Sequence, residues 1–255
     1  MTTQQDHATL FHACHVPGEP LVLFNAWDAG SARTVAGAGA KAIATGSWSV
    51  AAANGFDDGE HLSFAFALDN LRRIVAAVDL PVTVDLERGY GDAPEAVAAT
   101  VAAALEAGAV GCNLEDSFPG DGSLRDAGGQ VARLAAARAA AERAGVALFI
   151  NARTDVFFQK PADAHDAAMA DAALERARAY ADAGASGLFV PGVVAEDLIA
   201  RIVEASPLPV NVMVMPATPP RARLAELGVA RISHGPGPYI GAMQWLAQAA
   251  REAMG

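Results

Sequence analysis

The sequence contains few cysteines, no long hydrophobic run and fewer basic than acidic residues. Only two of the 255 residues are cysteines, Cys14 and Cys112. That number is too small for a disulfide framework and favours a reducing compartment, so we predict a cytoplasmic protein. No apolar segment approaches the roughly 20 residues that cross a bilayer. The N-terminus also lacks the basic segment and apolar run of a signal peptide.

The deficit of positive charge excludes further classes of partner. The formal net charge is -11, which argues against nucleic acid and against an anionic membrane as the main partner. A small anionic substrate stays possible, because the local field at a site can oppose the overall charge. We therefore expect a small-molecule partner, with no nucleic acid and no membrane.

What the sequence does contain is a regular alternation of short apolar runs and alanine-rich helical stretches. Hydrophobic residues make up 53% of the chain, enough for a large core. The predicted strands cover residues 21–27, 41–47, 81–87, 109–116, 147–153, 187–192, 209–214 and 230–235. Eight strands alternating with helices predict an α/β fold, a (β/α)8 TIM barrel that forms a single domain over residues 1–255. The alternative is an open doubly wound sheet, but the first turn, NAWDAGSA, lacks its G-x-G-x-x-G loop.

Both ends of the chain carry helices outside the repeating pattern. The first 20 residues are predicted to form an N-terminal helical extension. The last stretch, YIGAMQWLAQAAREAMG, predicts an amphipathic helix anchored by Ile240, Met243, Trp245 and Leu246. This helix either closes the barrel or packs on a neighbouring subunit.

Carboxylates follow the third and fourth predicted strands. Asp85 and Glu87 are two residues apart, so on a strand their side chains share a face. Glu115 reaches a similar height on the adjacent strand. Three carboxylates in a partly buried barrel mouth require a cation, and oxygen ligands suit Mg²⁺, with Mn²⁺ as a second choice. The alternative is that these acids are solvated or pair with Arg88 and Arg153.

Arg153, at the end of the fifth predicted strand, is a candidate clamp for an anion. Its planar guanidinium group binds two oxygens at once. The alternative is a structural ion pair with Glu115 or Asp155.

Other strand ends provide further candidates for substrate contacts. Backbone N–H groups and hydroxyls of Thr45, Gly46 and Ser47 can receive an anionic group. The ring of Trp48 either forms a wall of the pocket or fills core. His234 is either an acid/base or a structural hydrogen-bonding group. We also include Asn211, on the seventh predicted strand, among the substrate-binding candidates.

Four segments together resemble the isocitrate lyase/phosphoenolpyruvate mutase superfamily. They read NAWDAGSARTVAGAGAKAIATGSWSVAAANGFDDGE, VDLERGYGD, NLEDSFPGDGSLRD and NARTD. Their order and spacing are specific to the superfamily and much less specific to one reaction. The resemblance implies a (β/α)8 barrel, often with the last helix swapped between the subunits of a homodimer or homotetramer.

The resemblance also implies a metal site. Mg²⁺ is expected near Asp85, with Glu87, Glu115 and Asp58 acting mostly through water. The family usually has Asp where this chain has Glu87, and the longer side chain still permits a water-mediated contact.

The resemblance further implies a substrate and a type of chemistry. Gly46 and Ser47 would receive a substrate carboxylate through backbone N–H groups, and Arg153 would hold an anionic group. Substrates of the family are small α-oxo or α-hydroxy acids. The shared chemistry forms or uses a metal-bound enolate, after a C–C or P–C bond breaks.

The loop after the fourth predicted strand departs from the family pattern. Lyases carry K-[KR]-C-G-H there, and phosphoenolpyruvate mutases carry a Lys and an Asn before a Ser-Leu pair. This chain reads FPGDGSLRD, whose only polar groups are Asp121, Ser123, Arg125 and Asp126. The oxaloacetate decarboxylase branch places a His where this chain has Pro236. We take Arg153, Ser123 and Glu115 as the candidate catalytic residues.

Three functions are compatible with these patterns. The first is a Mg²⁺-dependent lyase that cleaves a C–C bond in a small α-oxo or α-hydroxy acid. The second is a hydrolase, decarboxylase or P–C bond enzyme acting on an oxaloacetate- or phosphonopyruvate-like compound. The third is an α-oxo acid binding protein with little turnover.

Overall fold

Eight parallel strands form a nearly closed barrel in the computed structural model, which describes residues 2–255. The hydrogen-bonded order is β1-β8-β7-β6-β5-β4-β3-β2, and a bridge between Ala26 and Thr45 joins β1 to β2. The fold prediction is therefore confirmed. The strands are β1 (Leu21–Leu23), β2 (Ile43–Ala44), β3 (Val82–Asp85), β4 (Gly111–Glu115), β5 (Phe149–Arg153), β6 (Gly187–Phe189), β7 (Val210–Met213) and β8 (Arg231–Ser233).

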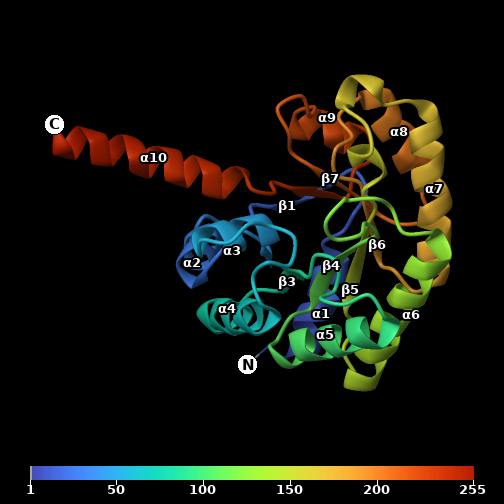
Figure 1. The fold of residues 1–255 in the computed structure, drawn as a ribbon, viewed down its shortest axis with the longest axis horizontal. Coiled ribbons are helices and arrows are strands. Elements are labelled where there is room, and N and C mark those ends of the chain that lie inside the picture. Colours follow the sequence, from blue (N-terminus) through green and yellow to red (C-terminus); the bar gives the residue numbers. More distant parts are fainter. Residues whose placement is uncertain (1) are drawn as a thin grey trace.

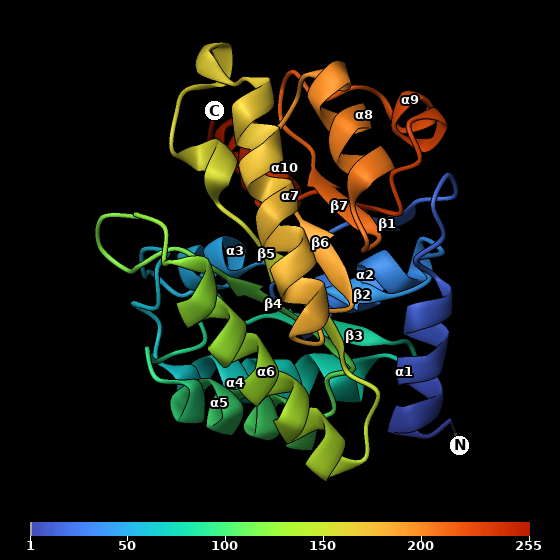
Figure 2. The ribbon, with the colours of Figure 1, turned by 90° about the vertical axis from the view of Figure 1, so that its right-hand side faces the viewer.

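Helices cover the outer face of the barrel (Figures 1 and 2). The α-helices are α1 (Gln4–Ala13), α2 (Ala29–Gly37), α3 (Ser47–Ala53), α4 (Phe64–Ala77), α5 (Pro94–Glu106), α6 (Ala127–Ala144), α7 (Ala167–Asp182), α8 (Glu196–Ala205), α9 (Arg221–Glu226) and α10 (Gly237–Met254). Two short 3₁₀ helices, η1 (Val156–Phe158) and η2 (Ala162–Ala164), follow β5.

Local sequence explains where several helices begin. The side chains of Asp28, Ser63, Asp126 and Asp166 cap α2, α4, α6 and α7 by accepting hydrogen bonds from backbone N–H groups of the first turn. Gly145 adopts a left-handed conformation at the end of α6, which turns the chain into β5.

The N-terminal helix α1 closes the lower end of the barrel, away from the carboxyl ends of the strands. Its Phe11 is fully buried, and its ring contacts Phe149 of β5 edge-on, with 5.5 Å between ring centres. Phe11 and its apolar neighbours, such as Leu21 and Phe149, therefore fill the end of the barrel opposite the carboxyl ends of the strands.

The C-terminal helix α10 projects away from the barrel (Figure 1). Pro238 is its one buried residue, and Trp245 is 71% exposed. The sequence left two alternatives for this helix, closing its own barrel or packing on a neighbouring subunit. The structure excludes the first, because the helix leaves its own barrel. On the outer surface between α2, β1 and α9 lies an open groove with a cavity volume of about 770 Å³, lined in part by Leu21, Val35 and Ala222.

None of the helices within residues 2–255 is both long enough and apolar enough to span a membrane.

Candidate active site

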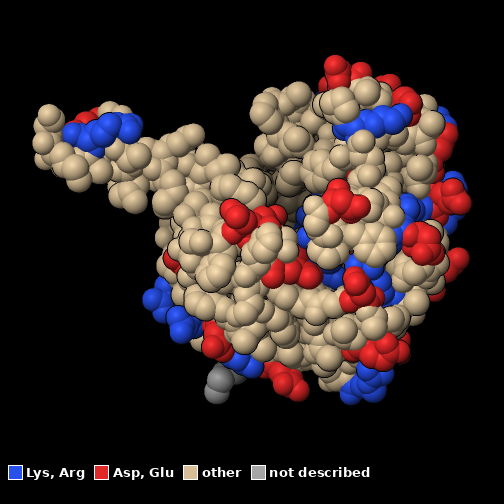
Figure 3. Space-filling model, in the orientation of Figure 1, with Lys and Arg blue, Asp and Glu red and all other residues tan. Residues whose placement is uncertain are grey.

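A cavity of about 220 Å³ lies at the carboxyl ends of the strands, where barrel enzymes place their chemistry. Figure 3 shows acidic side chains gathered around the hollow in this face. The cavity contains six of the residues predicted from sequence: Gly46, Ser47, Trp48, Asp58, Asp85 and Arg153. Trp48 forms part of its wall, which is the first of the two roles considered for this residue.

Asp85 is the last residue of β3 and is oriented by its neighbours. Its Oδ2 accepts a hydrogen bond from the backbone N–H of Ser47 at 3.2 Å. Its own backbone N–H donates to Oγ1 of Thr45 at 2.9 Å. Thr45 thus positions the backbone of Asp85 and does not line the cavity. The N–H of Ser47 is already bound to a carboxylate of the protein.

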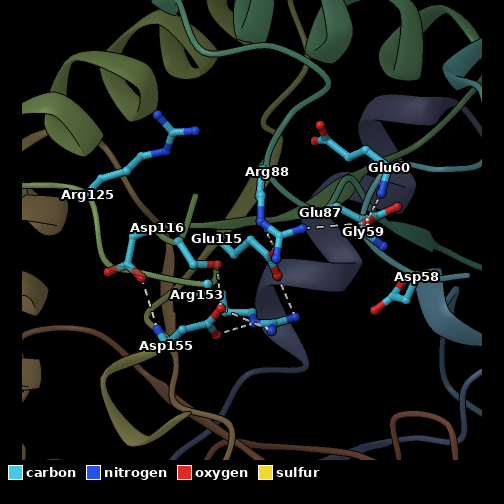
Figure 4. Close-up of polar contacts among 12 residues, drawn as sticks. Asp58, Gly59, Glu60, Glu87, Arg88, Glu115, Asp116, Arg125, Arg153 and Asp155 are labelled. Carbon is cyan, nitrogen blue, oxygen red and sulfur yellow. Dashed lines mark hydrogen bonds and ion pairs between the residues drawn. The ribbon is translucent and has the colours of Figure 1, made fainter. Parts of the chain in front are cut away.

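Glu87 follows the strand and is held by another loop (Figure 4). Its Oε2 accepts hydrogen bonds from the backbone N–H groups of Gly59 at 2.9 Å and Glu60 at 2.6 Å. Because β3 ends at Asp85 and Glu87 has φ +49°, strand alternation does not set its direction. Such a backbone conformation costs about 1–3 kcal/mol in a non-glycine residue, and the two hydrogen bonds help to hold it.

Glu115 lies between two arginines. Its Oε2 is 2.6 Å from Nη1 of Arg153, and its Oε1 is 3.2 Å from Nε of Arg88. Burial raises the pKa of Glu115 and Arg153 opposes the rise. With two guanidinium groups in contact, the charged carboxylate is the form that these contacts favour. The ion pairing that the sequence left open as an alternative is therefore present.

Arg153 is fixed on one side and open on the other. Asp155 accepts from its Nε at 2.6 Å and from its Nη2 at 3.2 Å, while Glu115 takes one Nη1 proton. Asp155 is itself held by the hydroxyl of Ser117 at 2.7 Å. A guanidinium group has five N–H donors, so two remain for a ligand, and Arg153 lines the cavity.

Three other predicted residues lie outside the lining of the cavity. Ser123 donates its hydroxyl to Asp121 at 2.8 Å within the loop after β4. The ring of His234 packs against Phe24, with 5.0 Å between ring centres. Asn211 is buried and hydrogen-bonds to Ser233.

The cavity also contains residues that the sequence analysis did not select. They are Asn25, Asn113, Phe158, Phe189, Met213, Ser233, Gly235 and Pro236. Asn113 could have been found, because it precedes Glu115 by two positions on β4 and so shares its face. Phe158 belongs to η1, and no pattern in the sequence marks that short helix as part of the site.

The charges around the cavity suit a hydrated divalent cation better than a closed metal cage. Within residues 2–255 no three Asp, Glu, His or Cys side chains are close enough to hold a metal ion together. Burial nevertheless raises the pKa of Asp58, and the negative charge of Asp85 adds to the rise. Mg²⁺ takes one or two direct carboxylates and keeps several waters. The residues therefore fit an ion held directly by Asp85, with the other acids acting through water.

Glu87 should make the metal-free protein less stable as the pH rises. Burial raises its pKa from 4.5 to about 7, and the charges of Asp58 and Asp85 contribute. Because the folded-state value is the higher one, the stabilisation is complete below about pH 4.5 and is lost as the pH approaches about 7. The expected loss is about 3 kcal/mol of unfolding free energy. The measurement is the unfolding free energy from urea titrations at a series of pH values, with EDTA present. Glu87→Gln should remove the decrease of this free energy between about pH 4.5 and about pH 7.

The matched control for that experiment is Glu142→Gln, on the exposed surface of α6. This variant should show the same dependence of unfolding free energy on pH as wild type. An unchanged slope in Glu87→Gln would show that the acid is not the source of the pH dependence.

Comparison with known proteins places the chain among enzymes of one family. A family model described as phosphoenolpyruvate phosphomutase matches residues 11–254. A solved structure of a proposed phosphonomutase from Burkholderia cenocepacia J2315 is 60% identical, with a TM-score of 0.96, and the match covers 98% of this chain and 99% of that one. The 2-methylisocitrate lyase of Salmonella typhimurium is 31% identical over 214 residues, 82% of this chain and 71% of the relative.

A more distant solved structure shares the fold. It is a phosphonopyruvate hydrolase in complex with oxalate and Mg²⁺, 24% identical, with a TM-score of 0.83 over 99% of this chain and 88% of that one. The extent of the family match, which includes the strand ends that line the cavity, agrees with the resemblance seen in the sequence. The chain is therefore a member of the phosphoenolpyruvate mutase/isocitrate lyase superfamily of enzymes.

Proposed function

We propose that the chain is a Mg²⁺-dependent carbon–carbon lyase acting on a small α-oxo or α-hydroxy acid. The observation that carries the proposal is the charge asymmetry of the cavity. Within residues 2–255, Asp58 and Asp85 line it and form no ion pair with an arginine, whereas Arg153 lines it with two donors unused. A cation on the acidic side and an anionic group on the arginine side would together hold an α-oxo acid. The volume of about 220 Å³ suits such a small molecule.

Asp85 would hold the ion directly, with Asp58, Glu87 and Glu115 acting through water. Bound Mg²⁺ would supply Lewis acidity that stabilises negative charge on the keto oxygen of the substrate. A structural neighbour of the same fold, the phosphonopyruvate hydrolase, was solved with oxalate and Mg²⁺. Because oxalate resembles a planar α-oxo carboxylate, this complex motivates the choice of ion and of ligand class.

The other residues of the cavity would bind and orient the substrate. Arg153 would hold the far anionic group with its remaining N–H groups. Gly46 would offer its backbone N–H and Ser47 its hydroxyl to the substrate carboxylate, because the backbone N–H of Ser47 is already bound to Asp85. Trp48 and Phe158 would form apolar walls that limit the access of water. Ser123 would reach the substrate only after movement of its loop, which contains Gly120 and Gly122.

The test of this function is a turnover assay. The purified protein is incubated with Mg²⁺ and a panel of α-oxo and α-hydroxy acids, and products are identified by mass spectrometry. We expect cleavage of at least one acid with a new carbonyl product, and loss of that activity in EDTA. Tight binding across the panel without turnover would replace the lyase proposal with a binding function. If the protein neither binds nor converts any acid of the panel, both the lyase function and the binding function are wrong.

We also propose that the chain is a homo-oligomer in which α10 of one copy covers the outer groove of another. The helix carries exposed Trp245 and Leu246, and the groove of about 770 Å³ lies where the barrel lacks a covering helix after β8. Apolar side chains on an isolated helix and an open groove are both unfavourable in water, and their association would bury both.

Size-exclusion chromatography with multi-angle light scattering tests this proposal. Wild type should elute at a multiple of the 26.1 kDa chain mass. The double variant Trp245→Asp/Leu246→Asp should shift to the monomer, whereas Gln248→Glu on the same helix should not. A monomeric wild type at high protein concentration would contradict it.

A further inference from the structure

Directly beneath the cavity lies a buried arginine that the proposed function does not use. Arg231, the first residue of β8, is 1% exposed. The centre of its guanidinium group lies 6.0 Å from the ring centre of Phe11, which closes the barrel from below. Above it are two residues that line the cavity: its Nη2 is 3.3 Å from Oδ1 of Asn113, and its Nε is 3.4 Å from Oγ of Ser233.

Arg231 has no acidic partner in direct contact. Within the described residues no ion pair forms to it, and its Nη1 has no hydrogen-bond partner. Burial lowers the pKa of Arg231 to about 9, and Asp85 is the acid that most opposes this shift. The group is therefore still a cation at neutral pH. A buried unpaired charge is costly, so a role in holding its neighbours is a more economical explanation than stability alone.

The arginine determines which way the amide of Asn113 points. Oδ1 of Asn113 accepts from Arg231 and also from Nδ2 of Asn151 at 2.9 Å. Rotating the amide by half a turn would place its NH₂ group against two donors, which is unfavourable. Oδ1 therefore faces Arg231 and Asn151 in the barrel interior. The Nδ2 group is on the other side of the amide, away from these two donors.

The Nδ2 group of Asn113 is available to a ligand. It makes no hydrogen bond to any residue from 2 to 255, and Asn113 lines the cavity. The register of the sheet pairs Asn113 with Asp85 on β3, so the free donor lies beside the proposed metal ligand. A donor fixed in direction next to the cation is suited to an anionic oxygen of a chelating acid.

We infer that Asn113 is a specificity-determining residue that donates an N–H to an oxygen of the bound α-oxo acid, and that Arg231 is the positioning residue that fixes this donor from below. The inference rests on the proposed function for its class of ligand. A fixed donor favours acids that present an oxygen at this point and disfavours those that do not, because the buried amide would be left unpaired.

The experiment measures binding, with oxalate as the probe. Isothermal titration with saturating Mg²⁺ gives the Kd of wild type, Asn113→Ala, Arg231→Met and Arg231→Lys. Loss of a hydrogen bond to a charged group should weaken oxalate binding by between about 10-fold and about 100-fold in Asn113→Ala. Arg231→Met should weaken oxalate binding by about 10-fold, although Arg231 itself would not contact the ligand. Arg231→Lys, which keeps a donor for Oδ1, should restore most of the loss.

Controls separate this effect from general damage. Asn54→Ala, at the exposed end of α3, and Arg138→Met, on the outer helix α6, should bind oxalate within about twofold of wild type, since neither residue lines the cavity. Thermal melts identify any variant that fails to fold. If Arg231→Met does not fold, Asn113→Ala still tests the donor and Arg231→Lys tests the positioning role. The Lys variant should bind oxalate more weakly than wild type and more tightly than Asn113→Ala, and a Kd equal to that of wild type would count against the positioning role.

The outcomes separate the two proposals. If wild type does not bind oxalate, the proposed function falls and this inference with it. If wild type binds and Asn113→Ala binds equally well, this inference alone is wrong. If Asn113→Ala is weak but both Arg231 variants match wild type, the positioning role of Arg231 is wrong.

Discussion

Replacing Asp85 by asparagine is expected to lower metal-dependent kcat/KM by at least about a thousandfold. Asparagine keeps an oxygen that can accept the N–H of Ser47, but it loses the charge that would hold the cation. A metal acting as a Lewis acid stabilises the transition state by several kcal/mol, and that stabilisation should disappear with the ion. The measurement is kcat/KM at several Mg²⁺ concentrations for an acid that wild type cleaves.

The fold of this variant should remain intact. Asp85 raises the pKa of both Asp58 and Glu87 by repulsion, so removing its charge relieves an unfavourable contact. We expect a melting temperature no lower than that of metal-free wild type. Asp182→Asn, at the exposed end of α7, is the control for loss of one acid and should keep full activity. Wild-type turnover in Asp85→Asn would remove the metal assignment.

Replacing Arg153 by lysine should weaken substrate binding by about a hundredfold, because a bidentate charged contact becomes a single point contact. In wild type the guanidinium group satisfies Asp155 and Glu115 and still has two free donors. One ammonium group cannot reach both acids and a ligand at once. The measurement is the Kd of the substrate or of oxalate with Mg²⁺ present.

Lysine keeps a positive charge between the two buried acids, so the variant should fold. Complete removal of the charge would leave Asp155 without an arginine partner and Glu115 with Arg88 alone. This should destabilise the protein by about 3–5 kcal/mol, which is why Arg153→Met is the less informative change. Arg178→Lys, on the exposed face of α7, serves as the control. A substrate Kd equal to that of wild type in Arg153→Lys would exclude the clamp.

The architecture could be predicted because its signals are local and repeated. Each apolar run is followed by a helical stretch, several of which begin at a recognisable cap such as Asp126 before α6, and eight such units indicate a barrel. The position of α10 could not be decided from the sequence. Its apolar face has the same pattern whether it covers its own barrel or another copy, and only the structure shows that it leaves its own.

The site could be predicted where side-chain direction follows from strand alternation. Asp85 and Arg153 end their strands and reach the cavity as expected. Alternation failed for Glu87, because the strand stops before it and the backbone turns to φ +49°. Arg231 was missed for a different reason. An arginine in a three-residue strand usually faces solvent, and its burial here depends on closure of the barrel and on α1 below it.

The account depends on one claim, that carboxylates at the strand ends and Arg153 together bind a divalent cation and an α-oxo acid. Titration of wild-type protein with oxalate, in Mg²⁺ and in EDTA, tests it most directly. We predict one site per chain in Mg²⁺ and a Kd at least about a hundredfold weaker in EDTA, because the ion supplies much of the binding charge. The same Kd under both conditions, or no binding in either, would contradict the claim.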